Sequence, residues 1–495
     1  MEAIVEWLVG QVWSIGLVIF ALGAGIFFSI ATRFLQIRYI KEMVMLLFEG
    51  KSSDTGISSF QAFCLALSGR VGIGNIAGVA TAIAFGGPGA VFWMWVMAIV
   101  GGASAFVEST LAQLYKSKVD NEYRGGTPYY IEKGLKVKWF AVLVASVVTL
   151  SYGMLLPGIQ SSNIAIGFES VSGLDKSITG VLLVALLATI IFGGVKRIAS
   201  ASQTIVPFMA IGYVVVTFIV LFFNITKIPE MFALIFSSAF GTNQAFGGIV
   251  GAAIAWGVKR AVFSNVAGVG EGTYSSAAAE VSHPAKQGLV QAFSVYIDTI
   301  VVCTATALMI LVTGMYNVTP EGKEPIVTTM GAIEAGPIYT QQAVETVLPG
   351  FGPLFVSIAI FFFAFTTLLA YYYIAETTLV YLDKKRTMPW LKIALKVVFL
   401  IMVYVGSVES ASFLWALGDL GIGSMAWLNL IAILLLTKPA LKVLQDYEMQ
   451  RKAGREPIFD PRKLGISGAD FWEEKCREAE GDVPDKGGKL KQGAL

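Results

Sequence analysis

Residues 70–79 read Arg-Val-Gly-Ile-Gly-Asn-Ile-Ala-Gly-Val, and residues 260–269 read Arg-Ala-Val-Phe-Ser-Asn-Val-Ala-Gly-Val. Each decapeptide places small and polar residues inside a long apolar segment. An interior glycine costs a helix about 1 kcal/mol relative to alanine, so the first stretch disfavours a continuous helix. Close helix packing through small residues would also explain the glycines, but it predicts no related partner elsewhere in the chain. The repeated motif therefore predicts two discontinuous helices.

Composition identifies an all-α polytopic membrane protein. Of the 495 residues, 55% are hydrophobic and 14% are charged, and the mean hydropathy is +0.70. A soluble globular chain has about 25% charged residues. Cys64, Cys303 and Cys476 lie far apart, which indicates reduced thiols rather than a disulfide framework or a metal site.

Apolar stretches of about 20 residues, the length that a bilayer core requires, predict eleven transmembrane helices. They are centred on residues 12–32, 60–85, 89–114, 140–167, 178–194, 205–223, 244–268, 288–313, 351–381, 390–407 and 411–436. With the first span taken as an extra helix, the remaining ten divide into five and five, and one interrupted span opens each half. Because five is odd, the second half must be inverted relative to the first, as in secondary transporters.

Positive residues predict the orientation, because lysine and arginine are retained in cytoplasmic loops. With the N-terminus outside and the C-terminus cytoplasmic, three lie in outward loops, namely Lys176, Lys227 and Lys323. Sixteen lie in inward loops: Arg33, Arg38, Lys41, Lys51, Lys116, Lys118, Arg124, Lys133, Lys136, Lys138, Lys196, Arg197, Lys286, Lys384, Lys385 and Arg386. This asymmetry predicts a multi-pass protein of the plasma (inner) membrane.

Four units follow from this division. Residues 1–59 form the N-terminal helix and an amphipathic segment, which is either a helix on the inner surface or a partly ordered connector. Residues 60–224 and 225–437 form the two inverted repeats. Residues 438–495 are polar with charges of both signs, and we expect a solvated cytoplasmic tail without activity of its own. We expect His283, in a short inward loop before Pro284, to lie in a solvated turn.

The pair Thr366 and Thr367 offers neutral oxygen ligands that suit a monovalent cation. From the pair alone, hydroxyl bonds back to their own helix are the stronger interpretation. Ionisable residues at membrane depth cost about 2.5–3.5 kcal/mol each, so they should be paired or line water. The candidates for gate or scaffold charges are Arg70, Glu108, Arg260, Asp298 and Glu376. Arg70 and Arg260 would lie on opposite sides of the site, or would form permanent salt bridges to the three carboxylates.

Residues 86–101, Gly-Gly-Pro-Gly-Ala-Val-Phe-Trp-Met-Trp-Val-Met-Ala-Ile-Val-Gly, resemble the signature of the sodium:alanine symporter family, also called alanine or glycine:cation symporters. The resemblance continues, in the same order along the chain, through residues 74–83, 263–265, 283–289, 297–303 and 363–367. It implies a leucine-transporter-type fold that carries a small neutral amino acid inward with Na⁺. It also implies a sodium site formed by carbonyls near Gly72 and Asn75 with the hydroxyls of Thr366 and Thr367.

The same resemblance implies a set of substrate-binding residues around the two interruptions. They are Gly72, Gly74, Asn75, Ala77, Gly78, Gln160, Phe263, Ser264, Asn265 and Gly268. Three departures fall in or beside this site: Val266 replaces a glutamate, Gly270-Glu271-Gly-Thr replaces Gly-Ser-Ala-Pro, and Ala370-Tyr371 replaces Gly-Trp. Tyr371 therefore joins the predicted pocket. The resemblance makes alanine or glycine the first candidate substrate, and the altered site leaves serine as a further candidate.

The leading hypothesis is a secondary-active symporter working by alternating access. The alternatives are a proton-coupled amino-acid transporter and a channel or sensor on a transporter scaffold. The sequence shows no phosphate loop, metal cluster or nucleophile constellation that would indicate an enzyme. The expected partners are Na⁺, a small neutral amino acid and the lipid bilayer, with no cofactor, no metal other than Na⁺ and no nucleic acid.

Overall fold

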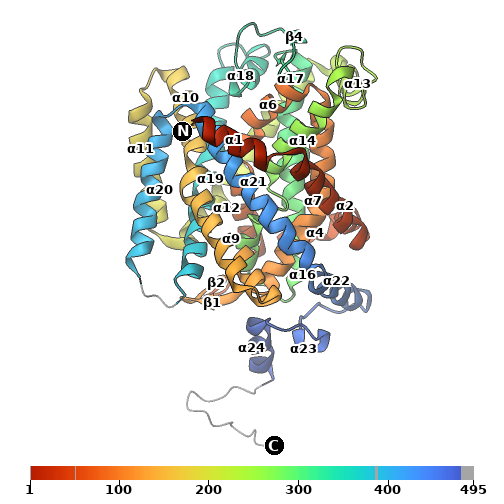
Figure 1. The fold of residues 1–495 in the computed structure, drawn as a ribbon, viewed down its shortest axis with the longest axis vertical. Helices are drawn as coiled ribbons and strands as arrows, with labels where there is room; N and C mark the ends of the chain where they lie inside the picture. Colours follow the sequence, from red (N-terminus) through yellow and green to blue (C-terminus); the bar gives the residue numbers. More distant parts are fainter. Residues whose placement is uncertain (1, 51, 385–387, 481–495) are drawn as a thin grey trace, which may run out of the picture.

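The computed structural model describes residues 2–50, 52–384 and 388–480. Lys51, Lys385 and Arg386 of the predicted inward charges lie outside the described residues, as do residues 481–495 of the predicted tail. The described chain is mainly helical (Figure 1). Two short antiparallel hairpins interrupt it, formed by β1 (Ser117–Val119) with β2 (Glu122–Arg124) and by β3 (Asn317–Val318) with β4 (Val327–Thr328).

The helices follow one another in four groups. The N-terminal group contains α1 (Glu2–Val12), α2 (Ile15–Ala31), α3 (Leu35–Arg38) and α4 (Ile40–Leu47). The second contains α5 (Ser59–Arg70), η1 (Ile73–Asn75), α6 (Ala77–Gly86), α7 (Gly89–Leu114), α8 (Thr127–Tyr130), η2 (Ile131–Leu135), α9 (Lys138–Leu150), η3 (Ser151–Leu155), α10 (Pro157–Ser172), α11 (Lys176–Ile191) and α12 (Gly194–Phe223).

The third group contains η4 (Ile225–Lys227), α13 (Ile228–Ala239), η5 (Gly247–Ile249), α14 (Val250–Asn265), α15 (Gly272–Ala278), α16 (Pro284–Val295), η6 (Tyr296–Cys303), α17 (Thr304–Thr313), α18 (Pro337–Glu345), α19 (Gly352–Leu382), α20 (Trp390–Val408) and α21 (Ala411–Leu435). The last contains α22 (Thr437–Lys452), α23 (Pro461–Leu464) and α24 (Asp470–Ala479).

Eight helical segments of the described chain are long and apolar enough to cross a membrane. They are Glu2–Ala31, Gly89–Leu114, Lys138–Ser172, Gly194–Phe223, Pro284–Thr313, Gly352–Leu382, Trp390–Val408 and Ala411–Leu435. The other three predicted spans coincide with shorter helices: 60–85 with α5 and α6, 178–194 with α11, and 244–268 with α14. The multi-pass, all-helical class is confirmed.

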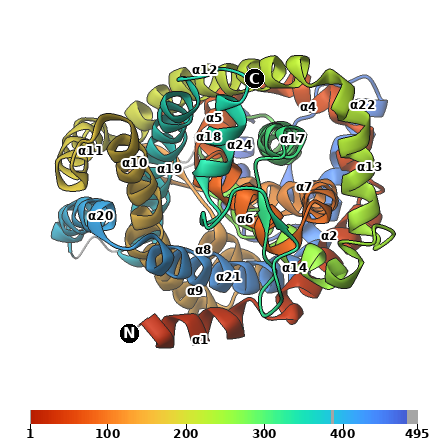
Figure 2. The ribbon, with the colours of Figure 1, turned by 90° about the horizontal axis from the view of Figure 1, so that it is seen from above.

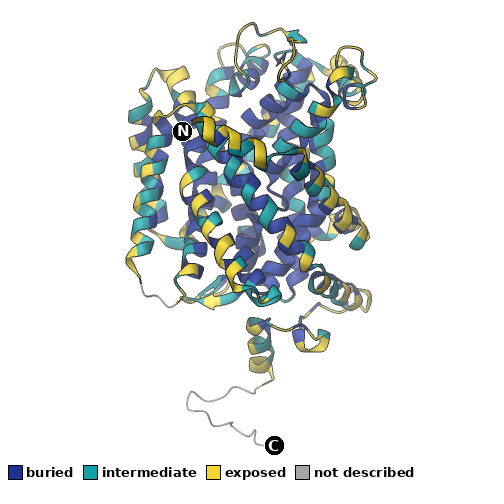
Figure 3. Ribbon diagram, in the orientation of Figure 1, coloured by how far each residue is buried: buried dark blue, intermediate teal, exposed yellow. Residues whose placement is uncertain are grey.

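The helices are arranged so that the interrupted ones lie inside. Seen from above, α6 is near the middle, whereas α1, α11, α12 and α13 lie at the periphery (Figure 2). Buried residues concentrate in the interior, and exposed residues lie mainly on the outer helices and at the two ends (Figure 3). Phe208, Phe218 and Phe222 of α12 are exposed large apolar side chains. Such an apolar exterior matches a lipid environment rather than water.

The predicted solvated tail is wrong for the part that the structure describes. Residues 437–480 contain α22, α23 and α24, and Trp472 of α24 is only 1% exposed. Its indole Nε1 donates to the Gln113 carbonyl at the end of α7 at 2.9 Å. The tail is polar on average, but it contains the apolar side chain of Trp472. Burial of this side chain removes apolar surface from water and stabilises the docked position of α24.

His283 is also buried, not solvated as the sequence predicted. It precedes α16, where its Nδ1 accepts from the Ala285 amide at 3.2 Å and caps the helix. Its Nε2 lies 3.2 Å from Asp446 Oδ2 on α22. The imidazole ring also contacts the rings of Tyr447 and Phe459. Burial lowers the pKa of His283, and the neighbouring Lys286 adds to this effect, whereas Asp446 opposes it.

Acid should therefore destabilise the folded protein. Because the pKa of His283 is lower in the folded protein than its unfolded value of about 6.5, protons bind preferentially to the unfolded chain, so stability falls as the pH drops through that value. We expect the melting temperature of the purified protein to fall between pH 7.5 and 5.5, and to fall less in His283→Gln. An equal fall in both proteins would assign the acid sensitivity to other groups.

Candidate functional site

The first interruption lies where the sequence predicted it. α5 ends at Arg70, and one 3-10 turn, η1, separates it from α6. Gly72 is extended, with φ −132° and ψ −152°, so its amide cannot bond as in a helix. The Asn75 side chain replaces that bond, because its Oδ1 accepts from the Gly72 amide at 2.9 Å. Asn75 thus stabilises the interruption locally.

The second interruption follows α14. Val266 has φ +47°, in the left-handed region that β-branched residues rarely adopt, at a cost of order 1–3 kcal/mol. Gly268 and Gly270 follow with φ +82° and +96° before α15 begins. Asn265 Oδ1 accepts from the Ala267 amide at 3.0 Å, the counterpart of the Asn75 contact. The backbone between residues 266 and 271 is therefore not helical.

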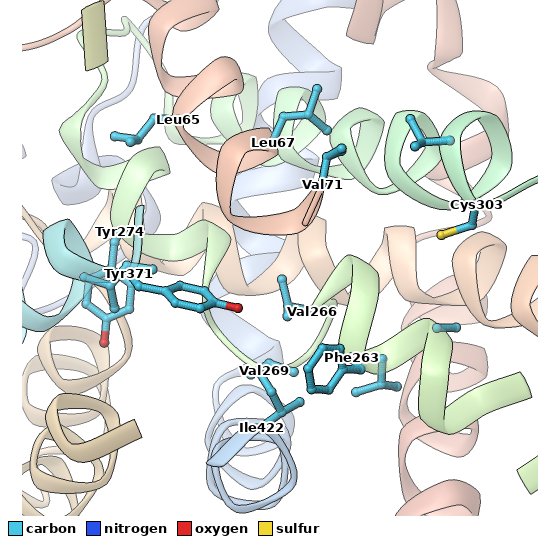
Figure 4. Packing of buried hydrophobic residues seen from close by; sticks show 14 of the residues in the cluster. Leu65, Leu67, Val71, Phe263, Val266, Val269, Tyr274, Cys303, Tyr371 and Ile422 are labelled. Atoms are coloured by element: carbon cyan, nitrogen blue, oxygen red, sulfur yellow. The ribbon is translucent and has the colours of Figure 1, made fainter. Parts of the chain in front are cut away.

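The two interruptions face each other. The position of a Cβ on Gly74 lies 3.2 Å from Phe263 Cδ1 and 3.3 Å from Ser264 Cα, so the lack of a side chain at Gly74 allows a close approach. Arg70 Nη1 donates to the Asn265 carbonyl. Figure 4 shows the region from close by, with Val71 of the first interruption above Phe263 and Val266 of the second. Residues 190 positions apart thus form one site.

Asp298, on the π-helical turn η6, joins both interruptions. Its Oδ1 accepts from Asn75 Nδ2 at 2.7 Å, and Ser264 Oγ lies 3.1 and 3.0 Å from its two oxygens. Thr299 Oγ1 donates to Oδ2 at 2.7 Å and accepts from Asn265 Nδ2 at 3.1 Å. All five residues are at most 1% exposed. Asp298, predicted as a gate or scaffold charge, is the hub of this buried polar network.

The opposite wall of the site comes from α10 and α19. Gln160 Oε1 accepts from the Ile73 amide at 3.3 Å, and Gln160 Nε2 donates to the Tyr371 hydroxyl at 3.4 Å. A Cβ on Gly72 would lie 2.7 Å from Thr367 Oγ1 and 3.3 Å from Gln160 Oε1. The structure therefore brings together Gly72, Gln160, Thr367 and Tyr371, which the sequence analysis assigned to the substrate and sodium sites.

The two adjacent threonines face different neighbours. Thr367 Oγ1 bonds to the Phe363 carbonyl of its own helix at 2.8 Å, and it also lies 2.9 Å from the Ser68 carbonyl and 3.4 Å from the Val71 carbonyl, at the end of α5. Thr366 Oγ1 instead contacts the Met209 sulfur on α12 at 3.7 Å and the Phe362 carbonyl of its own helix at 3.0 Å. Thr367 thus joins the first interruption and Thr366 does not. The carbonyls beside Thr367 belong to Ser68 and Val71, which the sequence did not single out.

A cavity of about 1030 Å³ leads toward the site from the end of the molecule that carries α18 and the β3–β4 hairpin. Ala77, Arg260 and Trp415 are among its lining residues. The ring of Trp415, which lines the cavity, lies 5.1 Å from the ring of Phe263 near the end of α14. Gly78 lies on this side as well, and a Cβ there would meet only Arg260 Cδ at 3.8 Å. Ala77 and Gly78 therefore lie on the side of the site that faces the cavity.

The predicted charges have different surroundings. Arg260 pairs with Asp419 at 3.1 Å, and Asp419 also pairs with Lys259 at 2.7 Å, so its partner is none of the three predicted carboxylates. Glu376 lies 3.9 Å from Arg124. Glu108 accepts from Asn429 Nδ2 at 2.7 Å, and the same amide donates to the Gly268 carbonyl at 2.9 Å. Arg70 Nε and Nη2 have no hydrogen-bond partner among the described residues.

Tyr152 is a site residue that the sequence did not reveal. It lies on η3, its hydroxyl donates to Glu271 Oε2 at 2.8 Å, and its ring lies 5.1 Å from that of Tyr371. The other oxygen, Glu271 Oε1, is buried without a partner among the described residues. Glu271 itself was visible as a departure from the family motif. No motif marks Tyr152, because its role depends on contacts with α15 and α19.

Tyr152→Phe should destabilise the protein. Removing the hydroxyl leaves both oxygens of a buried carboxyl group without a partner, which costs about 1–3 kcal/mol. We expect a lower melting temperature in Tyr152→Phe and a smaller decrease in Glu271→Gln, whose amide can still accept from Tyr152. If Tyr152→Phe has the same melting temperature as the parent protein, the contact with Glu271 contributes nothing to stability.

Comparisons with known proteins agree with this architecture. The family profile described as "Sodium:alanine symporter family" matches residues 1–461. YrbD of Bacillus subtilis, provisionally named a sodium/proton-dependent alanine carrier, is 59% identical over 94% of this chain and 96% of its own. The sodium/proton-dependent alanine carrier of Bacillus sp. PS3 is 53% identical, over 87% of this chain and 97% of its own.

A third relative comes from an archaeon. The sodium/alanine symporter AgcS of Methanococcus maripaludis is 36% identical over 89% of this chain and 96% of its own length. The matches span nearly the whole membrane region, including both interruptions and α19. The chain therefore belongs to the sodium:alanine symporter family.

Proposed function

We propose that this protein is a secondary-active symporter that couples inward movement of Na⁺ to uptake of a small neutral amino acid, with alanine or glycine as the preferred substrate and serine as a further one. The observation that carries the proposal is the meeting of the two interrupted helices at Asp298. Non-helical backbone inside a membrane protein is tolerated where it lines a binding site. The names of the relatives support the same substrate class.

The substrate would bind between residues 71–76 and 266–271. Helix N-termini attract a carboxylate, and freed carbonyls attract an ammonium group, so an unwound segment suits a zwitterion. The adjacent side chains are Asn75, Gln160, Ser264 and Tyr371, which are all nearly fully buried. A site here would select small side chains, because a Cβ on Gly72 would already lie 2.7 Å from Thr367 Oγ1 and one on Gly74 would lie 3.2 Å from Phe263 Cδ1.

Sodium would bind beside Thr367. Its hydroxyl and the carbonyls of Ser68 and Val71 already converge within 3.4 Å, and all are neutral oxygens, as a hard monovalent cation requires. Hydroxyl groups rotate, so Thr367 can turn a lone pair toward the ion. The site includes the end of α5, so ion binding would stabilise the first interruption and thereby the substrate site next to it.

The topology proposed with this function is one N-terminal helix followed by two inverted five-helix repeats, residues 60–224 and 225–437. In this arrangement the N-terminus is outside and the C-terminus is cytoplasmic. The excess of positive residues in the inward loops supports this orientation. The cavity beside α18 then opens to the outside, and the tail lies at the cytoplasmic end (Figure 1).

Protons are a second candidate coupling ion. Glu108 Oε1 and Glu271 Oε1 are buried without partners among the described residues, so these groups could be neutral in one transport state and charged in another. Two relatives are named as sodium/proton-dependent carriers. A channel or a sensor has no specific structural observation in its favour.

Uptake in liposomes tests both ions. We expect concentrative uptake of labelled alanine or glycine into proteoliposomes under an inward Na⁺ gradient, and its loss when Na⁺ is replaced by K⁺. One net inward charge is worth about 2.3 kcal/mol per 100 mV, so a negative interior should increase accumulation. Uptake driven by a pH gradient without Na⁺ would identify proton coupling. Binding without accumulation of any of the three amino acids would contradict the symporter proposal.

A further inference from the structure

The end of the molecule opposite the cavity is closed by a short connection between the two interrupted helices. Ile57, just before α5, forms a β-bridge with Ala279, just after α15. The Ile57 amide donates to the Ala278 carbonyl at 3.0 Å, and the Glu280 amide donates to the Ile57 carbonyl at 2.9 Å. The half-helices α5 and α15 are therefore tied together at their ends, away from the site.

The tail packs on the other side of this closure. The Phe459 amide donates to the Ser282 carbonyl at 3.0 Å, and Lys475 Nζ lies 2.9 Å from Glu280 Oε1. Trp472 bonds to the Gln113 carbonyl, while the Gln113 side chain donates to the Ala279 carbonyl at 2.9 Å. Residues 279–282 are thus held between α5 and the tail.

A buried lysine shows how closely the tail fits. Lys116 Nζ donates to the Ala279 carbonyl at 2.9 Å and lies 4.1, 4.6 and 5.4 Å from the rings of Tyr123, Phe471 and Trp472. Lys116 is fully buried although it follows a membrane helix at its polar end. Two of the three rings come from α24, so the tail supplies part of the environment that stabilises this cation.

We propose that the C-terminal tail, residues 437–480, is a brake that holds this end of the transporter closed. Helix α5 ends at an interruption, so it can swing about residues 71–76 as a rigid half-helix and open a path from the site. Residues 279–282 must part from Ile57 or move with it, and the docked tail opposes their movement. The docked tail thereby favours the state with the cavity on the opposite side. Helix α24 lies beyond residue 461, where the family match ends.

Cys64 provides a reporter within the chain itself. It lies on α5 and is fully buried in the closed state, so it becomes reactive only when α5 separates from its neighbours. The experiment measures the rate of N-ethylmaleimide labelling of Cys64 in the full-length protein in nanodiscs, with peptide mapping to separate it from Cys303. Cys476→Ser removes the tail thiol from all variants.

We expect Trp472→Ala to increase the labelling rate about tenfold, because the buried indole is the main apolar anchor. Lys475→Glu should increase it about two- to fivefold by repelling Glu280. Combining Lys475→Glu with Glu280→Lys should bring the rate back toward that of the parent, because the pair is restored in reverse. Lys463→Glu is the matched control, since Lys463 changes the tail charge equally but its side chain is 82% exposed.

Equal labelling rates in the parent and Trp472→Ala would overturn the brake, as would acceleration by Lys463→Glu equal to that by Lys475→Glu. The charge-exchange pair keeps the test valid if Trp472→Ala does not fold. The measurement uses neither substrate nor Na⁺. A labelling result that contradicts the brake would therefore not contradict the proposed symport. Likewise, an absence of uptake in liposomes would not change the conclusion from labelling.

Discussion

Thr367→Ala should raise the Na⁺ concentration for half-maximal uptake about tenfold, equivalent to about 1.4 kcal/mol of binding free energy. Thr367 contributes the only side-chain oxygen to the proposed group of Thr367 Oγ1 and the carbonyls of Ser68 and Val71. Its loss leaves the ion with backbone ligands alone. Uptake of labelled alanine in proteoliposomes, measured over a range of Na⁺ concentrations, checks the prediction.

Thr366→Ala is the matched control. Both hydroxyls bond back to their own helix, but that of Thr366 contacts Met209 instead of the Ser68 and Val71 carbonyls, so its removal should leave the Na⁺ dependence nearly unchanged. Equal effects of the two substitutions would mean that both hydroxyls bind the ion, as the family resemblance implied. Normal Na⁺ dependence in a well-folded Thr367→Ala protein would remove Thr367 from the ion site.

Gly72→Ala should reduce transport about a hundredfold while the protein still folds, because displacements of about 1 Å at a binding site have effects of this size. The backbone of Gly72, with φ −132°, is open to alanine, so the obstacle is steric. The new methyl group would lie 2.7 Å from Thr367 Oγ1 and 3.3 Å from Gln160 Oε1. It would therefore push apart groups of both proposed sites. Initial rates of alanine uptake, normalised to folded protein, measure the loss.

Gly78→Ala offers the comparison, because Gly78 belongs to the same motif. Its Cβ would meet only Arg260 Cδ at 3.8 Å, and alanine favours the helix α6. We expect transport within about threefold of the parent, as for a substitution that causes no overlap. Similar losses in both variants would show that the motif tolerates no side chain anywhere, and would weaken the assignment of Gly72 to the site.

Local features of the sequence predicted the interruptions correctly. Glycines and an asparagine inside an apolar segment disfavour a helix whatever surrounds them, and Asn75 and Asn265 bond to backbone two or three residues away. Their repetition after 190 residues also predicted a second interruption in the other half of the chain. These effects act within one turn of chain, which is why they can be read from the order of residues.

Contacts between distant elements could not be read in this way. Adjacent Thr366 and Thr367 look equivalent in sequence, but their helix directs one hydroxyl toward α12 and the other toward α5. Arg260 pairs with Asp419 rather than with Glu108, Asp298 or Glu376, because α21 lies beside α14 at that level. The sequence likewise did not predict the contact of Tyr152 with Glu271 or the docking of Trp472 on α7, because both join residues far apart in the chain.

The sequence by itself determined that the chain is a helical membrane protein with two interrupted helices, because hydropathy and backbone propensity are properties of short segments. Only the tertiary structure decided that Thr367 without Thr366 lies at the first interruption, that Asp298 joins the two interruptions, and that the tail closes one end. These outcomes depend on which helix faces are packed together. That choice is made by the fit of many side chains over the whole bundle, which no single segment contains.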